Sequence, residues 1–151
     1  MVVPNFFLMW QVQRNYALVA AAFRFYGQKE IPGSGSNPVI LEIINRYVPT
    51  DDDGKVAWCS IFLMEVCRLC DIKTNASPAA RSWLDVGREV KTPQFGDVAV
   101  FWRTSPSSWQ GHVGLYLGER ENDVLIISGN DADQVRVEYH EKRRLLGYRR
   151  I

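Results

Sequence analysis

With 151 residues, the chain is long enough for one domain with a buried core and short for two. Hydrophobic residues make up 46% and charged residues 23%, which argues against a mainly disordered or fibrous protein. Lys and Arg number 18 against 17 Asp and Glu, and a net charge of +1 disfavours a protein that mainly neutralises nucleic acid. Three cysteines are too few for a disulfide framework, so we expect reduced thiols.

The N-terminal segment has two apolar stretches, 6–10 and 17–23, which four polar residues between 11 and 15 separate. A membrane-spanning helix needs about 20 continuous apolar residues. A signal peptide needs a basic start and one continuous apolar run, and the segment has neither. We therefore expect no membrane insertion and no ordinary signal peptide.

Helices are predicted in the first half of the chain. Residues 15–26 are rich in alanine and end at a glycine, which is typical of a helix and its stop. Asn37 is suited to cap a second helix with Pro38 in its first position. Residues 58–70 are apolar around most of the helix circumference and contain no Gly or Pro, which predicts a helix buried at the centre of a domain.

Strands are predicted in the second half. The β-like stretches are 97–103, 112–118, 124–128 and 134–139. Helices followed by strands favour an α+β domain in which an antiparallel sheet packs against a central helix. We expect an N-terminal extension over residues 1–14 and a single domain over 15–151.

Cys59 is the first candidate for catalysis, because it stands where a loop turns into the apolar helix. Unpaired N–H groups and the helix dipole favour a thiolate there. A fall of ~2 units in its pKa would correspond to roughly 2.7 kcal/mol of thiolate stabilisation. The alternative is that Cys59 is a small buried apolar residue.

His112, at the start of a predicted strand, is the candidate base, since a neutral imidazole can accept a thiol proton and return it to a leaving group. The second histidine, His140, lies among charged residues and is predicted to be solvated.

The third candidate follows from the register of the hairpin. If residues 118 and 124 pair, His112 faces Asn130, whose amide could fix the tautomer of the imidazole. A slip of one residue would bring Gly129 or Asp131 opposite His112 instead.

Metal sites are not expected. Cys67 and Cys70 form a CxxC late in the apolar helix with no second pair, and we predict that both pack in the core. The three aspartates 51–53 match neither a calcium loop nor a metal pair.

Three motifs in chain order resemble the papain-fold cell-wall hydrolases, the NlpC-type and CHAP-type cysteine peptidases and amidases of bacteria and phages. They are Trp58-Cys59-Ser60 at the start of the helix, 93–98 (PQFGDV) entering a strand, and 111–118 (GHVGLYLG). The segments 27–33, 36–38 and 145–149 resemble a small single-domain branch of that superfamily.

The resemblance implies a papain-like α+β fold, with a central nucleophile-bearing helix on an antiparallel sheet of about four to six strands. By matching motifs, Cys59 is the nucleophile, His112 the base and Asn130 the third catalytic residue. The backbone N–H of Cys59 is expected to help hold the oxyanion. The residues expected to line the substrate groove are Trp58, Ser60, Trp109 and Tyr116.

The implied function is cleavage of an amide bond in the stem peptide of peptidoglycan, by an endopeptidase or an N-acetylmuramoyl-L-alanine amidase, without a cofactor. Many NlpC-type members have Asp where Trp58 stands, so a substrate contact differs here. Two alternatives remain open: a toxin or effector that acts on another amide or ester, and a non-catalytic binding or phage structural module.

The same resemblance bears on partners and localisation. We expect a monomer that binds the stem peptide and no nucleic acid, and an immunity or carrier protein is a possible partner. Synthesis in the cytoplasm is expected, followed by holin-like release or secretion to the cell wall or periplasm.

Overall fold

Helices precede strands along the chain, as expected. A computed structural model describes residues 5–33 and 35–151. The helices are α1 (Phe6–Phe23), α2 (Pro38–Asn45) and α3 (Cys59–Leu69), with 3-10 turns at Asp53–Lys55, Ala80–Asp85 and Lys142–Arg144. The strands are β1 (Arg88–Val90), β2 (Val98–Trp102), β3 (Gly111–Arg120), β4 (Asp123–Ser128), β5 (Arg136–Glu141) and β6 (Leu145–Arg150).

The strands form one six-stranded sheet in the order β1-β6-β2-β3-β4-β5, and every neighbouring pair is antiparallel. This confirms the α+β class and the upper end of the expected strand number. Neither β1 nor β6 was predicted from the sequence. The first is three residues long, and the second carries Gly and two Arg among its six residues, so neither shows a clear strand pattern.

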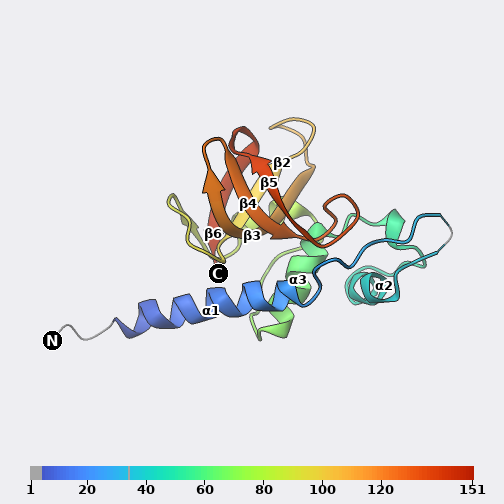
Figure 1. Ribbon diagram of the computed structural model, residues 1–151, viewed down its shortest axis with the longest axis horizontal. Coiled ribbons are helices and arrows are strands. Elements are labelled where there is room, and N and C mark those ends of the chain that lie inside the picture. Colours follow the sequence, from blue (N-terminus) through green and yellow to red (C-terminus); the bar gives the residue numbers. More distant parts are fainter. Residues whose placement is uncertain (1–4, 34) are drawn as a thin grey trace.

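Helix α3 packs against β3 and against α1, and it crosses α1 in Figure 1. Eight of its eleven residues are buried, which explains why the segment is apolar around most of its circumference. The main core gathers side chains from the helices and one face of the sheet, including Leu18, Phe62 and Val113. A smaller cluster that includes Phe101 and Val124 covers the other face. The central strands are therefore buried on both sides.

Helix α1 begins at Phe6, so the prediction of a helix starting at residue 15 was wrong. Two of the four polar residues that interrupted the apolar pattern, Gln11 and Asn15, are buried. Gln11 Nε2 donates to Asn15 Oδ1 at 2.9 Å and to the main-chain oxygen of Ile151 at 3.0 Å. The first turns of α1 extend beyond the rest of the chain (Figure 1). Within the described ranges, no helix has both the length and the apolar character needed to cross a membrane.

Asp97 joins three distant parts of the chain in a buried network. Its carboxylate accepts two hydrogen bonds from the Arg150 guanidinium, at 2.9 and 2.6 Å. It also accepts from Asn15 Nδ2 at 3.1 Å and from the backbone N–H of Gln94 at 2.7 Å. The network connects α1, the turn before β2 and the end of β6, and so fixes how the sheet and α1 meet.

Glu65 forms a second buried charge centre, on α3. Its carboxylate accepts two hydrogen bonds from Arg68, each 2.8 Å long, and one from the Tyr47 hydroxyl at 3.1 Å. The hydrogen bonds from Arg68 outweigh burial and lower the pKa of Glu65. The ionised carboxylate therefore contributes stability above the unfolded-state pKa of about 4.3, and that contribution is lost as the pH falls through the folded-state pKa.

We expect Glu65→Gln to lower the melting temperature at pH 7, and we expect the difference from the wild type to shrink towards pH 3. Thermal unfolding followed by circular dichroism at pH 7, 5 and 3 measures this. Glu42→Gln is the matched control on α2, because the Glu42 side chain is 76% exposed and its ion pair with Arg46 has little effect on stability. If Glu65→Gln lowered the melting temperature by the same amount at every pH, the stabilising role of the ionised Glu65 carboxylate would be contradicted.

Candidate active site

Cys59 is the first residue of α3 and is only 4% exposed. Backbone N–H groups of Ser60 and Val113 donate towards its sulfur, and these contacts favour the thiolate. Burial is the larger effect, however, and it raises the pKa of the Cys59 thiol. The expected fall in this pKa was wrong, because desolvation of a buried thiolate outweighs the helix terminus, and the resting thiol carries its proton.

A cavity of about 100 Å³ opens beside Cys59. Its lining residues are Ala57, Cys59, Pro78, Ala79, Ala80, Arg103, Trp109, Gln110 and Gly111. Trp109 lies in the loop before β3 and is 79% exposed, so its indole is free to contact a ligand in this cavity. The structure thus brings Trp109 and Cys59 together, as expected.

Two hydrogen bonds in series hold the side chain of His112, which lies on β3. They run through Ser128, the last residue of β4, to Asp131 in the turn that follows. His112 Nε2 lies 2.9 Å from Ser128 Oγ, and that hydroxyl donates to Asp131 Oδ2 at 3.4 Å. Because a carboxylate only accepts, the Ser128 proton points to Asp131, and Oγ is left to accept from Nε2–H. This arrangement leaves the lone pair on Nδ1 of His112. Burial lowers the pKa of His112, so the imidazole is neutral near pH 7.

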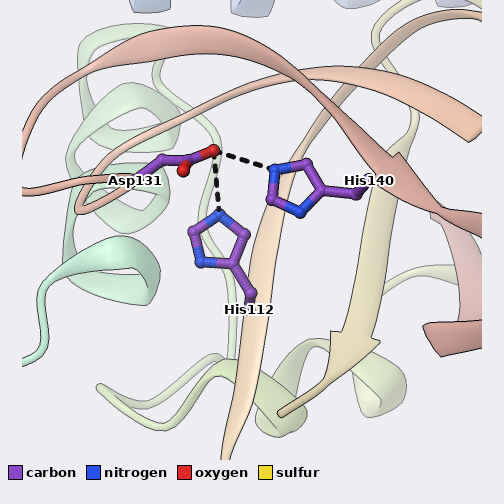
Figure 2. A group of neighbouring side chains, drawn as sticks. All are labelled: His112, Asp131 and His140. Atoms are coloured by element: carbon purple, nitrogen blue, oxygen red, sulfur yellow. Dashed lines mark hydrogen bonds and ion pairs between the residues drawn. The ribbon is translucent and has the colours of Figure 1, made fainter.

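His140 belongs to the same cluster, and the prediction that it is solvated was wrong. Its Nε2 lies 2.8 Å from Asp131 Oδ2, and its ring stacks on that of His112 with centroids 5.0 Å apart. Figure 2 shows both imidazoles directed at the same carboxylate. Pairing of β5 with β4 brings His140 opposite Val124, on the sheet face that the smaller apolar cluster covers. The burial of His140 could have been inferred from the apolar character of both faces of the central strands, because a residue on a strand beside them then faces apolar side chains.

Asn130 is not the partner of His112, because no hydrogen bond joins the two within the part of the chain that is described. The predicted pairing of residues 118 and 124 was wrong, because Gly118 pairs with Leu125. A bulge between residues 116 and 118 shifts the register, so that Leu115 pairs with Ile127 as the prediction requires nearer the site. Strand β4 nevertheless ends at Ser128, and Asn130 adopts a left-handed conformation with φ of 52°. The turn therefore leaves Asn130 on the wall of a second cavity, which His112 and Asp131 also line. It brings Asp131, the alternative from a register slip, towards the imidazole.

Cys59 and His112 lie at the same end of β3, because Gly111, the residue before His112, lines the cavity beside Cys59. Over residues 5–33 and 35–151, no hydrogen bond joins the thiol to the imidazole directly. Catalytic hydrogen bonds are often long when no substrate is bound. Nδ1 of His112 lies on the opposite side of its ring from Asp131 (Figure 2), so it is the nitrogen left to receive a proton.

Trp58 and Ser60 are core residues and do not line a groove, since neither has accessible surface. Trp58 Nε1 donates to Glu30 Oε1 at 2.6 Å, and Ser60 Oγ donates to the carbonyl of Ser77 at 2.5 Å. Both were expected to contact substrate, and their burial excludes such contact in this conformation.

Tyr116, the remaining candidate for the groove, stacks edge-to-face on Tyr148 with ring centroids 5.7 Å apart. It borders neither the cavity beside Cys59 nor the one beside His112. Trp109 is therefore the one predicted contact residue that the structure places beside the thiol.

Solved structures of similar fold include the P60 domain of an antigen from M. avium paratuberculosis, at 18% identity and a TM-score of 0.61, which covers 95% of this chain and 97% of that domain. The resuscitation promoting factor interacting protein RipA matches at 19% identity and a TM-score of 0.60, over 93% of this chain. A lipoprotein-like NLP/P60 protein of Staphylococcus aureus matches at 19% identity and a TM-score of 0.55, over 92% of this chain. No family model and no curated protein matches the sequence.

The chain thus has the fold of the NlpC/P60 proteins, and the papain-like fold expected from the sequence is confirmed. It spans 62% of the RipA chain and 41% of the S. aureus chain. At identities below 20%, the likeness defines the fold and leaves the chemistry to the residues of this chain.

Proposed function

We propose that this protein is a peptidoglycan hydrolase that cleaves an amide bond of the stem peptide by a cysteine mechanism. The observation that carries the proposal is a thiol at the N-terminus of the buried helix, next to a strand whose histidine has its Nε2 held by Ser128 and Asp131. The NlpC/P60 fold supports it, as does the exposed Trp109 at the cavity beside Cys59.

The reaction starts from a neutral pair, because burial raises the pKa of Cys59 and lowers that of His112. As Cys59 Sγ attacks the carbonyl carbon, its proton moves to Nδ1 of His112. Asp131, through Ser128, stabilises the imidazolium that forms and holds the ring in place. The Cys59 N–H helps to hold the oxyanion.

Collapse of the tetrahedral intermediate releases the amine, which takes the proton from His112, and leaves a thioester on Cys59. Water, deprotonated by His112, then hydrolyses the thioester and restores the thiol. Every proton that leaves sulfur or water passes through one imidazole, so no cofactor enters these steps. The proposal includes action as a monomer at the cell wall after cytoplasmic synthesis.

The test is digestion of purified peptidoglycan with the wild type and with Cys59→Ala, followed by mass spectrometry of the soluble products. We expect fragments from the wild type only, because the variant lacks the nucleophile but loses little volume. The masses separate an endopeptidase, which cuts within the stem, from an amidase, which cuts between muramic acid and L-alanine. Equal release by both proteins, or release by neither, would contradict the proposal.

A further inference from the structure

Two imidazoles converge on a single carboxylate oxygen of Asp131, which brings three metal-ligand side chains together (Figure 2). Asp131 Oδ2 lies 2.8 Å from His140 Nε2 and 3.9 Å from His112 Nε2. The ligand atoms of the three residues all lie within 4.8 Å of one another. Ser128 Oγ, 2.9 Å from His112 Nε2, adds an oxygen atom at the edge of this group of ligands.

We propose that His112, Asp131 and His140 form a zinc site, which binds through the two Nε2 atoms and Oδ2. In a tetrahedral site with bonds of about 2.0–2.1 Å, ligand atoms lie about 3.3 Å apart. The two separations from Oδ2, 2.8 and 3.9 Å, fall on either side of that value, and all the ligand atoms lie within 4.8 Å of one another, so small side-chain shifts complete the geometry.

The donor set favours a transition metal. Two imidazole nitrogens with one carboxylate oxygen suit Zn²⁺, as they also suit Fe²⁺, Ni²⁺ and Cu²⁺, whereas Mg²⁺ and Ca²⁺ prefer oxygen ligands alone. The neighbouring cavity of about 220 Å³ is lined by all three residues and leaves room for a water molecule at the fourth position. Three protein ligands and one open position distinguish this arrangement from a closed structural site with four protein ligands.

The protein holds these ligands in place before metal arrives. His112 lies on β3 and His140 on β5, and both strands pair with β4. Asp131 stands in the turn after β4, where Arg136 Nε lies 3.5 Å from its other oxygen, Oδ1, and leaves Oδ2 to face the histidines. Arg103 and Arg144 also border the cavity, and their positive charges weaken cation binding, which favours reversible exchange.

The consequence for activity rests on the proposed function. Zinc on Nε2 of His112 uses the lone pair of that nitrogen, so the proton of the neutral ring must move to Nδ1. Nδ1 then has no lone pair with which to accept the Cys59 proton. Zinc is therefore expected to inhibit the hydrolase reversibly, and a chelator is expected to restore it. No metal was expected from the sequence, where the CxxC pair and the aspartates 51–53 were the ligand sets considered and His140 was predicted to be solvated.

Binding is tested apart from activity. After treatment with EDTA and dialysis, the protein is titrated with Zn²⁺ by calorimetry and with Co²⁺ by visible absorption, where a tetrahedral site gives intense d–d bands. We expect one metal per chain. His140→Asn and Asp131→Ala should each weaken binding by more than about 100-fold, the upper end of what loss of an outer-shell partner costs. Circular dichroism shows that each variant is folded.

The control is Cys59→Ala, which removes the nearby thiol and should bind both metals as the wild type does. Loss of binding in this variant would assign the metal to the thiol and overturn the proposed site. Unchanged affinity in folded His140→Asn and Asp131→Ala, or no binding by the wild type, would overturn it as well. Failure to digest peptidoglycan bears on the proposed function alone, because both titrations measure metal directly. Zinc binding without inhibition would overturn the inhibitory role.

Discussion

Replacing His112 with alanine is expected to lower the rate of peptidoglycan hydrolysis by about 10³-fold or more, without loss of the fold. The imidazole is the group to which the proposed mechanism gives every transferred proton, and Nε2 of the neighbouring His140 is already bonded to Asp131. The rate of fragment release, measured by chromatography at saturating substrate, gives the change in kcat. Thermal unfolding checks that the variant is folded, and a rate within tenfold of the wild type would contradict the role of base.

Substitutions at the neighbouring positions 130 and 131 decide which residue assists His112 in catalysis. Asp131→Asn keeps the size of the side chain but removes the charge that stabilises an imidazolium, so kcat should fall by about 10²-fold or more. Asn130→Gly is the matched control, because glycine accepts the left-handed backbone at this position. We expect this control to retain activity within about tenfold. A larger loss for Asn130→Gly than for Asp131→Asn would restore Asn130 as the third catalytic residue.

Replacing Asp97 with alanine is expected to lower the free energy of unfolding by about 3–5 kcal/mol. The variant leaves the Arg150 guanidinium buried without its partner and removes the acceptor of Asn15 Nδ2 and of the Gln94 N–H. Urea unfolding followed by tryptophan fluorescence measures the loss.

Asp123→Ala provides the comparison for Asp97, since the ion pair of Asp123 with Arg120 is partly exposed and should contribute little. The double variant Asp97→Leu with Arg150→Met should recover part of the stability, because it removes both charges together. A cost below about 1 kcal/mol for Asp97→Ala would show that the buried network does not hold α1 to the sheet.

Local features of the sequence were sufficient for much of the framework. The apolar run without Gly or Pro identified α3, and Asn37 caps α2 through a side chain that accepts from the N–H of Val39 at 2.9 Å. Short stretches of β-forming residues in the second half identified the strands β2 to β5. Such features depend on neighbours within a few residues, so periodicity and capping chemistry reveal them.

The sequence by itself also placed Cys59 at the start of the buried helix and His112 near the start of β3, since both positions follow from element boundaries. Only the tertiary structure decided what surrounds them. His140 reaches Asp131 through the pairing of β5 with β4, and Gln11 is buried because α1 meets Ile151, 140 residues away. Burial also set the direction of the Cys59 pKa. Contacts between distant segments, and the loss of water that they cause, leave no local pattern to read.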